Sequence, residues 1–457
     1  MVGVAFGPCG RGVLLQGASG ALTITRSALD ILEAAFPPAK AAALGAEHLV
    51  LLQSARSLRQ QAGDGAKGML LTTAALLRGL QRQELHPGRA RVALARVGSA
   101  LSALLPRGAP AAPLDAARVV ESVLTTRFTA DVAAAVLPAA ASLLASAVDV
   151  QVLRAHLGVL CRRRHAAGRG VADSVLRDGL VVDGMLRFVD GVERCRRVVV
   201  LAGDDEDDVV DVQAAVSALV AGDVDVGGAL VVTSAALSDA SLSALRHVGA
   251  AVLHGVAAED ERFLLEWTLG RGDADVAVEV RAEPRGATWL GLAGVRQLQL
   301  HAPTQQLADQ LGAAVRDAVQ LLCFAGDVAV PGEALCPGGG WLETELHRAL
   351  GGLPLGREEL LRWHHLRLQR HDQHPIIGLL ASAFQGISDD EGLLRAVAEA
   401  VAAVPRALPR RHPTDPPPEP VSLRIAVVQH ALAAVGTLMA VDRALPLRAR
   451  TQDSSLI

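Results

Sequence analysis

The most chemically suggestive stretch of the sequence is the loop GDGAKG, Gly63 to Gly68, directly before an apolar, helix-forming run. Glycine turns let backbone N–H groups approach phosphate oxygens, and an aspartate or lysine there could add a metal ligand or a positive charge. The spacing is not that of a P-loop, because Lys67 precedes Gly68 and no serine or threonine follows it directly. Taken alone, these residues are better explained by an ordinary glycine turn that leads into a helix.

The composition limits the classes of protein that could carry this loop. A chain of 457 residues has room for two to four domains. Apolar residues make up 51% and charged residues 20%, which is typical of a globular protein, while aromatic residues at 2% imply aliphatic cores. The net charge is −4, the basic residues are scattered and aromatic stacking platforms are scarce, so we expect no nucleic-acid partner.

Cysteine spacing and the N-terminal pattern bear on localisation. The cysteines show no CxxC spacing, which argues against a zinc site and a disulfide framework and favours a reducing compartment. No charged segment followed by an apolar run opens the sequence, and no apolar run of membrane-spanning length is free of charge or glycine. We therefore expect a soluble, cytoplasmic protein without membrane insertion. The five cysteines are Cys9, Cys161, Cys195, Cys323 and Cys336.

Helical patterns lie toward both ends of the sequence. Apolar residues recur at three- and four-residue spacing from Ser27 to about Ala103 and again from Ala116 to about Leu160. Long helices return from Gln305, and a final helix is predicted over Ser422 to Leu445. Such helices suggest one domain built from both termini, with the remainder inserted into it.

The middle of the sequence alternates short β-branched runs with helical segments. Strands are predicted within Arg196 to Gly203, Gly228 to Ser234 and Gly249 to Val256. A helix is predicted over Ala258 to Gly270, because three acidic residues lie in its first turn. Alternation of strand and helix is typical of an α/β unit.

Three charged clusters have ordinary explanations. The acidic run Asp204 to Asp208 follows a predicted strand and fits a solvated loop, and the arginines Arg162 to Arg164 fit a charged surface hinge. The histidines of WHHLRLQRHDQH, His364 to His374, include no pair at the i, i+4 spacing of a helical metal site. None of these clusters is assigned to a site.

Four motifs, in this order along the chain, resemble those of group II chaperonins. They are FGPCGRG at Phe6 to Gly12, Gly63-Asp64-Gly65, the segment AAVRDAVQLL that contains Asp317, and Pro337 to Gly340 followed by Glu343 and Glu345. GDGAK followed by LLRGL is further similar to the divergent Bardet-Biedl syndrome branch of chaperonin-like proteins.

The resemblance implies an α+β multidomain, group II chaperonin-like fold. It would consist of a helical equatorial domain from both termini, a two-part intermediate domain and an α/β apical domain. The expected boundaries are 1–105 and 328–457 for the equatorial domain, 106–178 and 301–327 for the intermediate domain, and 179–300 for the apical domain.

The same resemblance assigns roles to particular residues. Asp64 falls on the aspartate that holds magnesium in chaperonins, and Asp317 on the catalytic carboxylate that positions the attacking water. The residues implied to bind nucleotide are Gly7, Pro8, Gly63, Asp64, Gly65, Ala66, Lys67, Gly338 and Gly339.

Departures from the family pattern indicate a degenerate nucleotide site. Ala66 and Lys67 stand where chaperonins have two threonines, which removes hydroxyls and adds a cation that could replace the charge of the metal ion. Arg26-Ser27-Ala28 replaces Asn-Asp-Gly, and the proline-rich segment Pro409 to Pro420 stands where chaperonins enclose the base and ribose. We expect weak or lost binding of ATP and magnesium and a vestigial Asp317, with GDGAKG kept as a turn that supports the fold.

The resemblance also implies a function and partners. Proteins of the Bardet-Biedl branch act with the cytosolic chaperonin to assemble the BBSome, the coat complex needed for cilium biogenesis. The expected partners are therefore cytosolic chaperonin subunits, the other Bardet-Biedl chaperonin-like proteins and BBSome subunits, in the cytoplasm and at the centrosome or ciliary basal body. The alternatives are an active ATP-dependent chaperonin subunit and a structural adaptor without nucleotide dependence.

Overall fold

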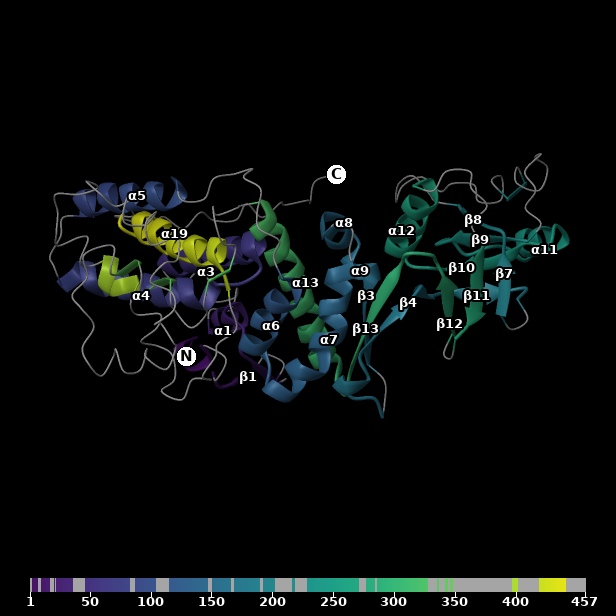
Figure 1. The fold of residues 1–457 in the computed structure, drawn as a ribbon, viewed down its shortest axis with the longest axis horizontal. Helices are drawn as coiled ribbons and strands as arrows, with labels where there is room; N and C mark the ends of the chain where they lie inside the picture. Colours follow the sequence, from purple (N-terminus) through teal and green to yellow (C-terminus); the bar gives the residue numbers. More distant parts are fainter. Residues whose placement is uncertain are drawn as a thin grey trace, which may run out of the picture. The chain divides into compact units, whose positions relative to one another are not determined.

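The computed structural model divides the chain into two compact units (Figure 1). Unit 1 combines Met1–Leu137 with Ala314–Ile457, and unit 2 is Pro138–Ala313. The structure describes residues 2–6, 10–16, 20, 22–35, 46–82, 87–103, 115–146, 150–165, 168–189, 192–201, 216–217, 228–270, 277–283, 286–327, 335–336, 342–343, 346–347, 397–401 and 419–440.

Unit 1 is built mainly from helices. Beyond the first turn of helix α4, the buried positions are Met69, Thr72, Thr73, Leu76 and Leu80, the spacing that places side chains on one helix face. The described helices that lie wholly in this unit are α1 (Ala28–Ala35), α3 (Ala46–Ala62), α4 (Ala66–Arg82), α5 (Pro87–Ala103), α6 (Ala116–Arg127) and α19 (Val421–Leu438), and α7 (Ala130–Ser146) and α13 (Gln305–Asp327) each lie partly in it.

Helix α19 joins the C-terminal part of the chain to the N-terminal helices. It packs against α3, α4 and α5, so helices from both ends of the chain contribute to one compact unit. Met69 and Leu76 are fully buried, whereas Leu70 and Leu438 are only half-buried. The finer domain boundaries stay a prediction.

Helix α19 is also the one described helix that is long and apolar enough to cross a membrane. Two-thirds of it is buried within the structure, and it carries Arg424 in an ion pair with Glu343. Both features are those of a helix in a protein core.

Short strands complete the described part of unit 1. The 3-10 helix η1 (Val2–Ala5) precedes an antiparallel hairpin of β1 (Val13–Gln16) and β2 (Leu22–Thr25). Farther along the chain, β14 (Leu335–Cys336) pairs with β15 (Glu419–Pro420), which leads directly into α19.

Unit 2 contains an α/β layer at the predicted strands. The order β6-β10-β9-β8 has β8, β9 and β10 parallel and β6 antiparallel at one edge. Helix α11 packs on β10, and Val231, Leu245 and Val252 belong to the core beneath it. The elements are β6 (Met185–Arg187), β8 (Arg197–Val200), β9 (Ala229–Thr233), α11 (Asp239–His247), β10 (Ala251–His254) and α12 (Ala258–Leu269), so the strands and the helix expected there are confirmed.

Two further sheets were not predicted. One has the antiparallel order β5-β12-β11-β7, and the other places β13 between β3, which is parallel to it, and β4, which is antiparallel. Their strands are β3 (Cys161–His165), β4 (Val175–Asp178), β5 (Leu180–Asp183), β7 (Val192–Cys195), β11 (Val278–Ala282), β12 (Ala287–Gly291) and β13 (Arg296–Ala302), accompanied by η2 (Val171–Asp173), α8 (Val150–Ala155) and α9 (Leu157–Leu160).

The arginine run in β3 is held by acids of the same unit. Arg162 forms an ion pair with the buried Asp260, Arg163 Nη1 lies 2.8 Å from Asp309 Oδ1, and Arg164 Nη2 lies 3.6 Å from Asp183 Oδ1. These arginines are structural, as expected, although Arg162 is partly buried rather than on the surface. Asp204 to Asp208 and His364 to His374 lie outside the described residues.

Candidate functional site

The GDGAKG loop connects two long helices of unit 1. The Gly63 N–H donates to Arg59 O at 2.8 Å, which ends α3, and the Met69 N–H donates to Gly65 O at 3.0 Å, which begins α4. Gly63 and Gly65 have φ angles of +76° and +94°, values that residues with a side chain rarely adopt. The loop is therefore a tight turn at the N-terminus of a helix.

Both glycines also permit close packing. A Cβ at Gly63 would overlap with the carbonyl oxygen of Asp317 on α13, and one at Gly65 would lie 2.5 Å from Val427 Cγ2 on α19. Glycine is thus required here for contacts with two other helices, independently of any phosphate. The expectation that the loop supports the fold follows directly from this packing.

Asp317 lies against this loop and is bound by two arginines. Arg59, on α3, donates from Nη2 to Asp317 Oδ2 at 2.9 Å and from Nε to the same oxygen at 3.1 Å. Arg127, at the end of α6, donates from Nη1 to Asp317 Oδ2 as well. The carboxylate is buried, so both guanidinium groups neutralise it where water screens little.

Arg127 also reaches Asp64. Its Nη2 donates to Gly63 O at 3.1 Å and lies 3.7 Å from Asp64 Oδ1. Burial alone would raise the pKa of Asp64, but the charges of Arg127 and Lys67 and the N–H of Gly65 outweigh it and hold the pKa below its usual value. Burial likewise works to lower the pKa of Arg127, yet Asp317 and Asp64 raise it. One guanidinium therefore bridges the two carboxylates.

The ammonium group of Lys67 binds two backbone carbonyl oxygens. It donates to Ala5 O at 3.2 Å and to Thr126 O at 3.1 Å, which ties α4 to η1 and to the end of α6. Burial lowers the pKa of Lys67 to about 8, with Asp64 opposing the shift and Arg127 adding to it. The expectation that Lys67 could stand in for a metal ion is thus better met by Arg127.

Lys67 gives unit 1 a pH dependence that can be measured. Since its pKa is about 8 in the folded state and near 10.5 when unfolded, the unfolded chain binds more protons between these values, and stability should rise as pH increases from 8 to 10.5. The sequence contains two lysines, Lys40 and Lys67, and no tyrosine, but its five cysteines also titrate in this range, and the raised pKa of the buried Cys336 acts in the opposite direction. Urea denaturation should therefore show the contribution of Lys67 as a stability difference between the wild type and Lys67→Met that grows in favour of the wild type from pH 8 to 10.5. An equal rise in both proteins would contradict the assignment.

The space left within this cluster is small. A cavity of about 20 Å³ lies between Arg26, Arg59, Asp64, Lys67 and Arg127, together with neighbouring backbone. A site of that size accommodates about one water molecule, since one needs roughly 10–15 Å³. The described residues consequently do not fit a magnesium-bound triphosphate, because Arg127 occupies the space between the carboxylates. No group of three potential metal ligands occurs in the described part of the chain.

A second ion-pair cluster adjoins the loop. Arg424, on α19, donates from Nη1 to Glu343 Oε1 at 3.3 Å and from Nε to Glu419. Arg424 Nη1 lies 3.6 Å from the position that a Cβ would take at Gly68. Burial raises the pKa of Glu419, against the opposing charge of Arg424. The glutamate after the triple glycine thus serves an internal ion pair next to α4.

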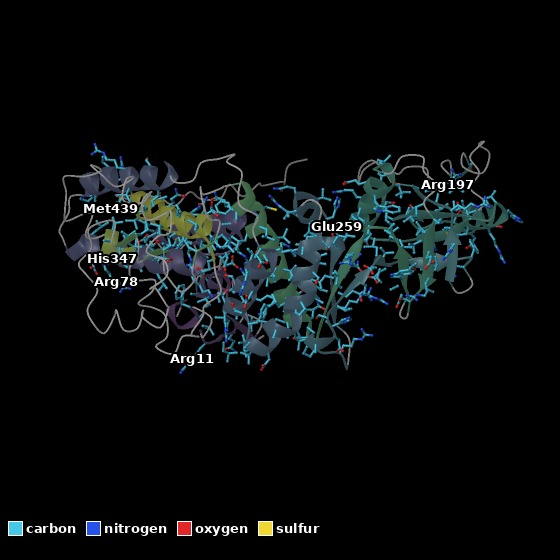
Figure 2. All side chains as sticks on the ribbon, viewed as in Figure 1. Arg11, Arg78, Arg197, Glu259, His347 and Met439 are labelled. Atoms are coloured by element: carbon cyan, nitrogen blue, oxygen red, sulfur yellow. The ribbon has the colours of Figure 1, made fainter. Side chains whose placement is uncertain are left out.

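The structure brings together all of the expected site residues that it describes. Gly63, Asp64, Gly65, Ala66 and Lys67 form the loop and the first turn of α4, and Asp317 contacts it from α13. Gly7, Pro8, Gly338 and Gly339 lie outside the described residues. Figure 2 shows the side chains of the described residues on the ribbon, with Met439 at the C-terminal end of α19.

Arg59 and Arg127 were not anticipated. Both belong to helices that the periodicity predicts, but arginine is abundant throughout this sequence and a single one carries little information. Sequence can reveal ion pairs between residues three or four positions apart on one helix. The ion pairs of Arg59 and Arg127 with Asp317 are not of this kind, because the partners are far apart in the sequence.

Comparisons with known proteins identify the architecture. No family model matches the sequence, and no curated protein matches it. Among solved structures, a group III chaperonin in the open state matches with a TM-score of 0.62, 15% sequence identity, and coverage of 97% of this chain and 96% of that chain. The chain has the chaperonin fold.

The structural match covers the parts of the chain that contain the four motifs. The match extends over nearly the whole of both chains, so it includes unit 1 and unit 2 alike. At 15% identity, the likeness establishes fold alone. The chemistry of the GDGAKG loop therefore depends on the residues of this chain.

Proposed function

We propose that this chain is a chaperonin-like assembly factor that acts by binding partner proteins, with weak or no ATP hydrolysis. The observation that carries the proposal is Arg127, which pairs with Asp317 and lies 3.7 Å from Asp64. In an active site of this kind, the two carboxylates would serve a metal ion and a water molecule. Here the guanidinium supplies the balancing charge, which supports a site that needs neither.

ATP turnover tests the proposal directly. We expect no steady-state hydrolysis above background with magnesium in the wild type, and none in Asp317→Asn, a substitution of similar shape. The reason is that Arg127 and Arg59 hold Asp317 away from any other role. Robust hydrolysis in the wild type that is abolished in Asp317→Asn would instead establish the rival, an active ATP-dependent chaperonin subunit, which the presence of both aspartates in one site favours.

Calorimetric titration with magnesium and ATP addresses the second rival. Residual contacts to phosphate without enclosure of the base would give a dissociation constant of millimolar or weaker, or about 4 kcal/mol or less of binding free energy. Absence of any heat of binding at these concentrations would favour a structural adaptor without nucleotide dependence.

We further propose a place for the chain among chaperonin-like proteins. The residues GDGAK and LLRGL support the Bardet-Biedl syndrome branch, and most closely the Bardet-Biedl syndrome 10 protein. The proposed activity is then folding or assembly of BBSome subunits together with the cytosolic chaperonin, in the cytoplasm and at the centrosome or ciliary basal body.

Affinity capture from ciliated cells tests these partners. The tagged full chain should recover cytosolic chaperonin subunits and the other Bardet-Biedl chaperonin-like proteins, and Asp64→Asn should recover them equally, because partner binding does not depend on a metal site. A folded, soluble bait that recovers neither group would contradict this part of the proposal.

A further inference from the structure

Unit 2 contains a large apolar cavity that is separate from the GDGAKG loop. Its volume is about 960 Å³, near the upper end of the roughly 300–1,000 Å³ found for small-molecule sites. Residues of α7, α8, α9, α12 and the segment from β12 to β13 line it, and Glu259 in the first turn of α12 is labelled in Figure 2. The apolar lining includes Leu143, Leu153, Phe263, Trp267, Trp289 and Leu292.

The charged groups that line this cavity are already neutralised. Arg296 donates from Nε to Asp178 Oδ1 at 3.0 Å, and Arg194 donates from Nε to Glu279 Oε1 at 3.0 Å. The Asp178 side chain is 86% exposed, so its ion pair lies toward solvent. A charged ligand would have to break one of these pairs or bury its own charge without a partner, and both are unfavourable. The lining therefore favours an uncharged ligand.

Trp289 is a fixed wall of the cavity. Its indole N–H donates to Asp178 O at 3.0 Å, and the Arg281 guanidinium lies over the ring, 4.8 Å from its centroid. A Cβ at Gly291 would lie 2.9 Å from the six-membered ring, so this glycine makes room for it. Fixation lowers the entropy lost when a ligand binds. Trp289 thus offers a ligand apolar surface rather than a free hydrogen-bond donor.

The backbone beside the cavity already pairs within unit 2. The Gly179 N–H donates to Val295 O at 2.8 Å, and the Val295 N–H donates to Leu292 O at 3.2 Å. Strand β12 lies between β5 and β11, so both of its edges are paired. A polypeptide in the cavity would bury peptide groups beside backbone that is already bonded, which is unfavourable. A small molecule without peptide groups avoids this cost.

We propose that this cavity binds a small, uncharged, mainly hydrocarbon molecule, an aliphatic chain or ring system with at most one neutral polar group. The hydrocarbon part packs against Leu153, Phe263 and Trp289, and the polar group stays toward solvent. Neither the nucleotide site nor the assembly role enters this argument, so the site stands whether or not the proposed function does.

A series of primary alcohols tests the apolar part of the proposal on the full protein. Trp341→Phe and Trp363→Phe leave Trp267 and Trp289 as the fluorescent reporters. We expect a saturable change in tryptophan emission with hexanol, heptanol and octanol, with affinity rising about three- to fourfold for each added methylene group. No saturable change, an affinity independent of chain length, or a loss of circular dichroism that accompanies the emission change would each overturn the proposal.

Charged probes and a peptide test the selectivity. Octanoate and octylammonium match octanol in chain length, and each should bind about fivefold or more weakly than octanol, because the lining offers no free counter-charge. Trileucine that is acetylated and amidated at its ends, and so uncharged, should bind no more tightly than octanol. Equal or tighter binding of either charged probe, or tighter binding of the peptide, would contradict the assignment.

A pair of valine variants locates the effect. Val152 lines the cavity and is 52% exposed, so Val152→Glu should fold and should weaken octanol binding about fivefold or more by adding charge and volume. Val175→Glu is the matched control, since Val175 is 43% exposed in the same unit and does not line the cavity. Unchanged octanol binding in Val152→Glu, or an equal loss in Val175→Glu, would show that the probe binds elsewhere.

Discussion

Replacing Arg127 with methionine should destabilise unit 1 by about 3–5 kcal/mol, because removing one partner of a buried ion pair leaves the other charge uncompensated. The side chain of Arg127 is only 15% exposed, and it serves Asp317, Asp64 and the Gly63 carbonyl together. Methionine keeps most of the apolar volume, so the loss reports charge and hydrogen bonds rather than a cavity. Hydrogen exchange of peptides from α4 and α13 is the suitable measurement, since a chain of two units need not unfold in one step.

Two comparisons isolate the bridge. Arg59→Met should cost less, because Arg59 is 29% exposed and has no described ion pair other than that with Asp317. The double variant Arg127→Met with Asp317→Asn should recover part of the loss, since the uncharged amide no longer needs a cation. Equal protection of α4 and α13 in the wild type and in Arg127→Met would show that the bridge contributes nothing to stability.

The elements that periodicity and β-branching specify were predictable from sequence. Helix α4 repeats apolar residues at helical spacing. Strands β8, β9 and β10 consist mainly of valine, leucine and alanine, and every residue of β9 and β10 is buried. The motif order placed Asp64 and Asp317 in one site, and the structure brings both to Arg127. These features are local, or follow from the order of the motifs along the chain.

The remaining features depend on contacts that no local pattern encodes. Strands β7 and β11, VERC and VEVRA, are four and five residues long and carry charges, so their pairing became evident only in the sheet. Arg127 ends an unremarkable helix in a sequence rich in arginine, and its role arises from where α6 meets α13. The sequence therefore predicts a degenerate nucleotide site, but it does not reveal the arginine that lies between Asp64 and Asp317.

Gly63→Ala should be more disruptive than its small size suggests, with a loss of about 2–5 kcal/mol or failure of unit 1 to fold. Two terms combine: the φ angle of +76° costs an L-residue about 1–2 kcal/mol, and overlap of the new Cβ with the Asp317 carbonyl oxygen adds the typical 1–3 kcal/mol of overpacking. The overlap is with backbone, so no side-chain rotation can relieve it. Instead α3 or α13 must shift, which also disturbs Arg59 and Arg127 on Asp317.

Two matched glycines separate these terms. Gly20 has a φ angle of +79° with nothing within 4 Å of its Cβ position, so Gly20→Ala should cost only the about 1–2 kcal/mol of backbone strain. Gly98, inside α5 with equally open space, should instead gain about 0.5–1 kcal/mol on substitution by alanine. Urea denaturation monitored by circular dichroism should rank the variants Gly98→Ala, wild type, Gly20→Ala and Gly63→Ala in decreasing stability. If Gly63→Ala matched Gly20→Ala, the loop would not be packed against α13, and the glycine would be free to serve a phosphate after all.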